Sequence, residues 1–346
     1  MAIANSRAPV QGKFDGARRL ELQGLTVGFP GAQGYTTVVH DLDMQVAPGE
    51  RIAIVGESGS GKSVSMMALL GLLQPNARIS GRLRYAGRDV DISSQRALRP
   101  LRGSEIGMVF QDPMSSLNPT MTVGRQMVQA LVKHRGVGRR QALDRAEQLL
   151  EQVGIRNPRE RLTQYPHEFS GGMRQRIMIA AALMPEPAML IADEPTTALD
   201  VTVQRQILLL LRSLSENLGL SIVLITHDLA VVANFAQRAY VMYAGRVVEE
   251  RDLEGMLNTP RHPYTSGLLS CVPRLDRPRD EPLHPIPGRP IRPDEVTAGA
   301  CSFAPRCPHA MEHCREEQPK LVRVGDGAVS CWLNGATGLA PAGLDR

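Results

Sequence analysis

An eight-residue segment of the chain has the composition and spacing of a phosphate-binding loop. It fits the pattern G-x-x-x-x-G-K-[ST] and consists of Gly56, Glu57, Ser58, Gly59, Ser60, Gly61, Lys62 and Ser63. Glycines let backbone N–H groups turn toward a phosphate, and the N-terminal end of a following helix adds a positive field. The lysine can bind the β- and γ-phosphates of ATP while the serine hydroxyl binds Mg²⁺. An apolar strand before the loop and a helix after it argue against a chance glycine-rich turn.

A second candidate is an apolar run that ends in two acids. Residues 188–192 are Ala-Met-Leu-Ile-Ala, and Asp193 and Glu194 follow directly. Such a strand suits ATP hydrolysis if Asp193 holds the Mg²⁺ shell and Glu194 polarises the attacking water. Taken alone, the segment is equally typical of a strand followed by a solvated acidic turn. The phosphate-binding loop on the same chain favours the catalytic interpretation.

The segment Phe-Ser-Gly-Gly-Met-Arg-Gln at 169–175 carries a family resemblance. Ser170 suits a helix N-cap, and the two glycines that follow allow close backbone approach at that helix end. The segment resembles the signature motif of the ATP-binding cassette (ABC) family, with Met173 where Gln is commonest. Other P-loop ATPases lack this motif just before the second acidic strand. The resemblance implies that two subunits pair head to tail and that the motif contacts ATP held by the partner, through Ser170, Gly171, Gly172 and Met173.

Three further landmarks of the family follow in the right places. Gln111, after the apolar run 106–110, matches the Q-loop, and His227, after 221–226, matches the switch histidine. Asp200, in an Ala-Leu-Asp sequence, matches the D-loop. The resemblance implies that Asp200 links the two ATP sites across the subunit interface.

The same resemblance implies a division of labour among the polar residues. Glu194 activates the water, and Gln111 and His227 sense the γ-phosphate and complete the catalytic group. Gln111 also joins Ser63 and Asp193 around Mg²⁺.

An aromatic ring that stacks on adenine is also expected. Phe29 lies where the stacking aromatic of the family usually falls, and Tyr35 is the competing candidate. A plain core aromatic is the alternative interpretation of either ring.

Strands and helices alternate along the chain, which indicates a parallel α/β sheet. The expected strands are 19–27 (an edge strand), 38–46, 51–55, 106–110, 188–192, 221–225 and a hairpin of 239–243 and 246–249, and the expected helices are 63–73, 139–153 and 203–214. The resemblance implies a P-loop ABC nucleotide-binding domain over residues 17–258. This domain would have a RecA-like core, an antiparallel β subdomain and a helical subdomain at about 112–170.

Two short stretches resemble the oligopeptide/dipeptide importer branch of the ABC family. They are Gln-Asp-Pro-Met-Ser-Ser-Leu-Asn-Pro at 111–119 and His-Pro-Tyr-Thr at 262–265. The second stretch is also typical of a proline-bounded helix start. The branch implies a second ATPase subunit of different sequence, two transmembrane permease subunits and an extracytoplasmic solute-binding protein. Import of nickel, glutathione or opines, a soluble ABC ATPase of translation or DNA repair, and a redox-sensing module remain alternatives.

The chain after residue 258 changes in character. Proline becomes dense, so we expect a linker or regulatory segment at 259–300, a cysteine module at 301–333 and a disordered tail at 334–346. All five cysteines lie beyond residue 270: Cys271, Cys301, Cys307, Cys314 and Cys331. In a reducing cytosol, clustered cysteines favour a metal site over disulfides.

The last four cysteines have the spacing C-x5-C-x6-C-x16-C, which resembles the C-terminal module of these importer ATPases. Four thiolates suit a [4Fe-4S] cluster, which we favour, or Zn²⁺, for which His309 and His313 are possible substitute ligands. Cys271 is interpreted as an inert buried thiol. Because the metal would mainly stabilise the fold of the cysteine module, Cys307→Ser or Cys314→Ser should loosen this module and leave the phosphate-binding loop intact.

Composition bears on whether the chain binds nucleic acid and whether it spans a membrane. The chain has 346 residues and a net charge of +5, yet its Lys and Arg are scattered, so we expect no nucleic-acid partner. No segment reaches the roughly 18 consecutive apolar residues of a membrane span, and residues 1–16 lack the apolar core of a signal peptide. We therefore expect a peripheral protein on the cytoplasmic face of the bacterial inner membrane, attached through partner subunits.

Overall fold

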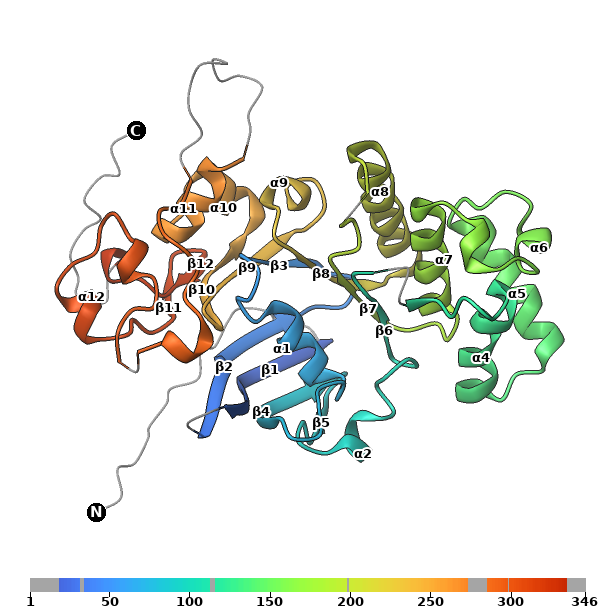
Figure 1. Ribbon diagram of the computed structural model, residues 1–346, viewed down its shortest axis with the longest axis horizontal. Coiled ribbons are helices and arrows are strands. Elements are labelled where there is room, and N and C mark those ends of the chain that lie inside the picture. The colour runs from blue at the N-terminus through green and yellow to red at the C-terminus, as the bar shows by residue number, and fades with distance from the viewer. Residues whose placement is uncertain are drawn as a thin grey trace.

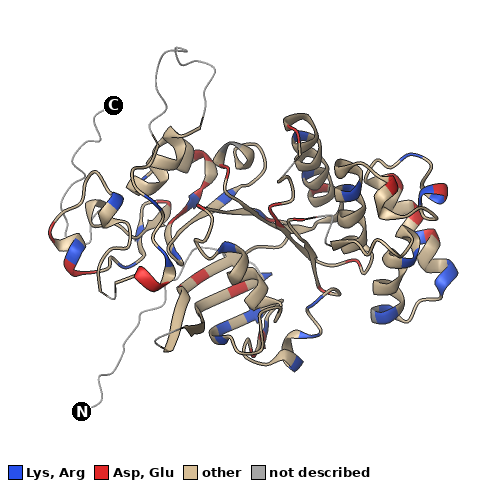
Figure 2. Ribbon diagram, in the orientation of Figure 1, with Lys and Arg blue, Asp and Glu red and all other residues tan. Residues whose placement is uncertain are grey.

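The computed structural model describes residues 19–31, 34–112, 116–197, 199–272, 285–297 and 299–334. Two sheets occupy the middle of the molecule, with a helical lobe at one end and the C-terminal region at the other (Figure 1). Lys and Arg are interspersed with Asp and Glu along the ribbon (Figure 2). Within the described ranges, no helix is long and apolar enough to cross a membrane.

The larger sheet has the strand order β11-β12-β10-β9-β3-β8-β7-β6. Its parallel part consists of β3 (Arg51–Val55), β6 (Ile106–Val109), β7 (Met189–Asp193), β8 (Ser221–Thr226) and β9 (Arg238–Tyr243). Strands β7 and β8 are buried throughout, as is usual for parallel strands covered on both faces. The expected parallel α/β core is therefore confirmed. Its parallel strands bring their carboxyl ends to one edge, where ligands bind in folds of this kind.

The smaller sheet is antiparallel, with the order β2-β1-β4-β5. It contains β1 (Leu20–Gly31), β2 (Gly34–Val46), β4 (Arg78–Tyr85) and β5 (Arg88–Val90). The expectation that residues 19–27 form an edge strand is wrong, because β1 pairs with β2 on one side and with β4 on the other. An alternating pattern indicates that one face of a strand is buried, and it carries no information on how many neighbours the strand has.

The helical lobe contains α4 (Val123–Arg135), α5 (Arg139–Gln152), α6 (Pro158–Arg161), the short 3₁₀ turn η1 (Pro166–Glu168) and α7 (Gly171–Leu183). The apolar face predicted for 139–153 is buried in full, at Ala142, Ala146, Leu149, Leu150 and Val153. Helices α5 and α7 contribute to one apolar core. The other helices among the described residues of the ATPase region are α1 (Lys62–Leu69), α2 (Gln95–Leu98), α8 (Val201–Leu218), α9 (Leu229–Val232) and α10 (Leu253–Asn258).

The C-terminal region contains more regular structure than the expected linker. Helix α11 (Pro263–Ser270) occupies part of the expected linker, whereas residues 273–284 and 335–346 lie outside the described residues. The region also holds η2 (Pro293–Glu295), η3 (Ala304–Arg306), α12 (His313–Glu316), β11 (Val322–Val324), β12 (Gly327–Val329) and η4 (Trp332–Asn334). Strand β12 pairs antiparallel with β10 (Arg246–Asp252), so the tail extends the main sheet. Strands of three residues are too short to show a periodicity.

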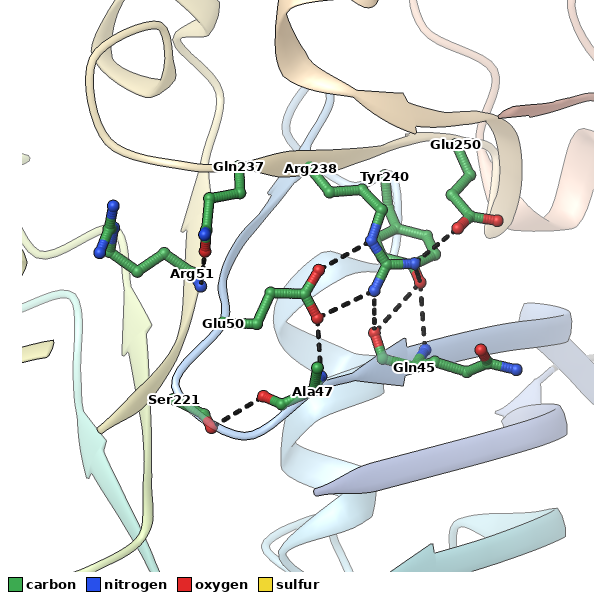
Figure 3. Close-up of polar contacts among 9 residues, drawn as sticks. All are labelled: Gln45, Ala47, Glu50, Arg51, Ser221, Gln237, Arg238, Tyr240 and Glu250. Atoms are coloured by element: carbon green, nitrogen blue, oxygen red, sulfur yellow. Dashed lines mark hydrogen bonds and ion pairs between the residues drawn. The ribbon is translucent and has the colours of Figure 1, made fainter. Parts of the chain in front are cut away.

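A largely buried polar network ties the two sheets together (Figure 3). Arg238 in β9 donates from Nε to Glu50 Oε1 at 2.9 Å, from Nη1 to Glu250 Oε1 at 2.6 Å, and from Nη2 to the Gln45 carbonyl of β2 at 2.8 Å. The Tyr240 hydroxyl accepts from the N–H of Gln45 at 3.1 Å. Burial opposes the charge of Arg238, but Tyr240 and the two carboxylates outweigh this effect and raise the pKa of the guanidinium.

Candidate nucleotide-binding and hydrolysis site

The predicted phosphate-binding loop joins β3 to α1 at the carboxyl edge of the sheet. Gly56 has φ of +157°, and a Cβ there would lie 2.2 Å from the carbonyl oxygen of Met242, so a larger residue would displace β9. Gly61 is the N-cap residue of α1 with φ of +94°, in the region that favours glycine. The loop therefore leads directly onto a helix N-terminus, as an anion site of this type requires.

Lys62 folds back over the loop. Its Nζ donates to the carbonyl oxygens of Gly56 at 2.8 Å and of Glu57 at 2.9 Å. Burial lowers the pKa of Lys62, and nearby carboxylates, that of Glu194 foremost, oppose this shift. The ammonium is thus largely desolvated and close to the acids of β7, where it can meet phosphate oxygens at little further cost in hydration.

The predicted Mg²⁺ ligands Ser63 and Asp193 meet although they are 130 residues apart. Ser63 Oγ donates to Asp193 Oδ1 at 2.8 Å. Burial raises the pKa of Asp193, and the Ser63 hydrogen bond opposes it. A divalent cation favours the ionised carboxylate, and hydroxyl and carboxylate oxygens are donors that Mg²⁺ prefers. The residues therefore fit this ion.

Glu194 is the centre of a hydrogen-bonded group. Gln111 Nε2 donates to its Oε2 at 2.9 Å, and His227 Nδ1 lies 3.3 Å from its Oε1. Thr197 Oγ1 also donates to Oε2 at 2.9 Å. The three residues predicted to act in catalysis are thus brought together from the ends of β6, β7 and β8. Sequence reasoning missed Thr197, whose only signal is its position three residues after the acid.

The backbone at Glu194 is in an unusual conformation. Its φ is +44°, a left-handed value that is uncommon for residues other than glycine. The N–H of Glu194 donates to the carbonyl oxygen of Ile225 in β8 at 2.9 Å, which fixes this turn to the neighbouring strand. The carboxylate is therefore aimed by both its backbone and its side-chain partners.

The signature residues begin a different helix. Ser170 is the N-cap residue of α7 and accepts from the N–H of Met173 at 3.4 Å. Ser170 and Gly171 are exposed, and a Cβ on Gly172 would lie 2.7 Å from Val203 Cγ1 of α8. Helix α7 lies well apart from α1 in Figure 1, so this motif does not join the phosphate-binding loop of its own chain.

The D-loop residue has a structural role in its own chain. Asp200 is the N-cap residue of α8, and its Oδ1 accepts from the N–H of Val203 at 2.9 Å. Residue 198 of the same loop lies outside the described residues.

The two aromatic candidates lie near the turn of the β1–β2 hairpin. Phe29 pairs with Thr36 and is partly buried against the core, whereas Tyr35 is 43% exposed. The guanidinium carbon of Arg78 lies 3.6 Å from the centre of the Tyr35 ring. A ring already stacked on a cation is less available for adenine, which favours Phe29.

The four clustered cysteines line one small pocket: Cys301, Cys307, Cys314 and Cys331. None forms a disulfide, and the N–H of Cys301 donates to the carbonyl oxygen of Cys314 at 2.8 Å. Burial raises the pKa of the Cys331 thiol to about 12. Among the described residues, however, no group of three or more His, Cys, Asp or Glu side chains is arranged to hold a metal ion.

The two histidines proposed as substitute zinc ligands lie in different surroundings. His309 lines it, whereas His313 packs edge-on against Trp332 with ring centres 4.2 Å apart. Cys271 is the C-cap residue of α11 and is partly buried, whereas the sequence predicts a buried thiol.

Comparison with known proteins places these features in a family. The family model for the ABC transporter domain matches residues 39–197, and the model for the oligopeptide/dipeptide transporter C-terminal region matches residues 248–314. The oligopeptide transport ATP-binding protein OppD of Salmonella typhimurium is 48% identical over 87% of this chain and 89% of its own length. The dipeptide transport ATP-binding protein DppD of Bacillus subtilis is 47% identical over 91% of this chain and 94% of its own.

Solved structures agree with this placement. An ATP-binding cassette in a dimeric post-hydrolysis state with ADP and phosphate has a TM-score of 0.60 and 28% identity, covering 68% of this chain and 98% of the cassette. The cbiO1 protein of Clostridium perfringens, part of an ABC transporter complex, has a TM-score of 0.59 and 29% identity, covering 71% and 97%. From these matches and the site geometry, the chain belongs to the ATP-binding proteins of the ABC oligopeptide/dipeptide transporter family.

Proposed function

We propose that this chain is the ATP-hydrolysing subunit of an ABC importer that drives uptake of oligopeptides or dipeptides. The observation that carries the proposal is the group around Glu194, which Gln111, Thr197 and His227 hold beside the Ser63–Asp193 pair. The names of the OppD and DppD relatives support peptides as the solute.

The residues of one chain divide the chemistry among them. Lys62 and N–H groups of the loop would bind the triphosphate, while Ser63, Asp193 and Gln111 would hold Mg²⁺. When bound, Mg²⁺ neutralises charge on the phosphate oxygens. Glu194 accepts a proton from the attacking water, and His227 keeps the carboxylate oriented toward the γ-phosphate.

A second ATPase subunit completes each site. We infer that it is a different chain and pairs head to tail, so that the exposed N-terminus of α7 reaches the γ-phosphate of the partner. The residues assigned to this contact are Ser170, Gly171, Gly172 and Met173. Asp200 links the two sites, and Phe29 stacks on adenine.

The remaining partners are two transmembrane permease subunits and an extracytoplasmic solute-binding protein. The Q-loop and the helical insertion, roughly Gln111 to Glu168, would form the cleft that receives the permeases. The helical lobe projects away from the two sheets (Figure 1). The chain would then work at the cytoplasmic face of the bacterial inner membrane as a peripheral subunit. Scattered charge in Figure 2 supports the expectation that nucleic acid is not a partner.

Uptake of a radiolabelled tripeptide by host cells tests the function. Cells whose only copy carries Glu194→Gln should lose this uptake, while uptake of a free labelled amino acid continues. Loss of nickel, glutathione or opine uptake instead would reassign the solute. Normal uptake of all four solutes, with no permease co-purifying, would favour a soluble ABC ATPase.

We also propose that the four pocket cysteines hold a [4Fe-4S] cluster, with Zn²⁺ as the alternative. Support comes from the shared pocket and from the absence of disulfides among them. Since no metal-holding arrangement is formed in the described residues, binding would require the thiols to deprotonate and rearrange. The bound group would then supply folding energy to a region with a small apolar core.

Metal analysis of protein purified without oxygen tests this proposal. We expect about four iron and four acid-labile sulfide per chain, and a clear loss of both in Cys307→Ser. Cys271→Ser, outside the pocket, is the matched control and should keep the wild-type content. One zinc without sulfide would select the alternative, and a metal-free chain would contradict both.

A further inference from the structure

The C-terminal region makes a direct contact with the phosphate-binding loop. Arg306 of η3 donates from Nη1 to Glu57 Oε2 at 2.7 Å and from Nη2 to Glu57 Oε1 at 3.0 Å. Its Nε donates to the carbonyl oxygen of Pro287 at 2.8 Å. The Arg306 side chain is 5% exposed, and this two-pronged pair joins residues 249 positions apart. Such geometry is selective for arginine, because lysine cannot form two parallel bonds to one carboxylate.

A second residue of the same region holds the backbone of Glu57. The N–H of Glu57 donates to the Tyr264 hydroxyl at 2.8 Å, so it faces α11. Tyr264 is fully buried, and its ring lies 4.7 Å from that of Tyr243 and 5.4 Å from that of Phe303, centre to centre. This aromatic cluster leaves the hydroxyl little freedom to move.

Three groups of Glu57 therefore form hydrogen bonds with other residues. Arg306 binds its carboxylate, Tyr264 binds its N–H, and Lys62 binds its carbonyl oxygen. The first two partners come from outside the ATPase motifs. A lone carboxylate at the second position of the loop would repel the triphosphate of ATP, and a guanidinium bound to it cancels most of that field.

We propose that Arg306 and Tyr264 are positioning residues for ATP binding, through which the C-terminal region sets the charge and backbone geometry of the phosphate-binding loop. The proposal rests on the ATP-binding role assigned above and is independent of the solute and of any metal. It also revises one expectation from the sequence. Because Arg306 directly precedes Cys307, loosening the cysteine region should disturb the loop as well.

Equilibrium binding of a fluorescent ATP analogue to the full-length chain tests the proposal. Arg306→Gln should raise the Kd about tenfold, because an unpaired charge then faces the phosphates. Single-turnover hydrolysis at saturating ATP should fall by less than about twofold, since Glu194 and its partners are untouched. Arg306→Lys, which keeps the charge, should recover part of the affinity.

Two further variants distinguish this positioning role from a general effect of the packing of the C-terminal region. The double variant Glu57→Gln/Arg306→Gln lacks the Glu57 carboxylate charge, although it also lacks the Arg306–Glu57 ion pair. Its Kd should therefore return most of the way to the wild-type value. Tyr264→Phe keeps the buried ring and removes only the acceptor, and should raise the Kd about threefold. Arg289→Gln breaks an exposed pair with Glu295 in the same region and is the matched control.

The outcomes are distinct. A folded Arg306→Gln protein with wild-type Kd would overturn the proposal, and so would a double variant as weak as the single one. An equal loss of affinity in Arg289→Gln would also overturn the proposal, because any disturbance of the C-terminal region would then weaken ATP binding. If the wild-type chain itself fails to bind the analogue, the ATPase assignment fails instead.

Discussion

Replacing Glu194 with Gln is expected to lower the steady-state rate of ATP hydrolysis by about 10³-fold while ATP binding persists. The amide has nearly the size of the carboxylate, so the contacts with Gln111 and His227 can largely be kept. It cannot accept a proton from the attacking water. Phosphate release should be measured with the site of the partner subunit silenced, alongside equilibrium binding of nucleotide.

Glu216→Gln is the matched control for this substitution. Glu216 lies on α8, is half exposed, and pairs with Arg212 at 3.1 Å and with Arg51 at 3.5 Å. Its turnover should stay within about twofold of wild type, since exposed pairs contribute little. Wild-type turnover in Glu194→Gln would reject the assigned base. Loss of both nucleotide binding and turnover would mean that Glu194 maintains the structure of the site and is not specifically the catalytic base.

Replacing Arg238 with Met should lower the free energy of unfolding by about 3–5 kcal/mol. The substitution leaves the carboxylates of Glu50 and Glu250 buried without their cation, and each side chain is less than one-fifth exposed. It also removes the bond to the Gln45 carbonyl that ties β9 to the antiparallel sheet. Urea denaturation followed by circular dichroism would measure the loss.

Two comparisons make this result specific. Arg212→Met removes an exposed pair within α8 and should cost less than about 0.5 kcal/mol. Adding Glu50→Gln and Glu250→Gln to Arg238→Met should restore part of the stability, because the unpaired charges are then gone. A loss below about 1 kcal/mol in Arg238→Met would contradict the role assigned to the network.

The sequence by itself determined the chemistry of the ATP site. The phosphate-binding loop, the acidic end of β7 and the signature segment are each encoded within eight residues or fewer, so their patterns survive without knowledge of the fold. The alternation of apolar strands and helices also predicted the parallel core and the buried face of α5. These features depend on local spacing, which the chain carries directly.

The tertiary structure alone decided how distant segments meet. Strand order places Gln111 and His227 beside Glu194, and no local pattern contains that order. The pair between Arg306 and Glu57 depends on docking of a C-terminal region whose strands β11 and β12 are too short to be recognised. Long-range contacts of this kind arise from packing between whole elements. Their partners therefore have no fixed spacing in the sequence.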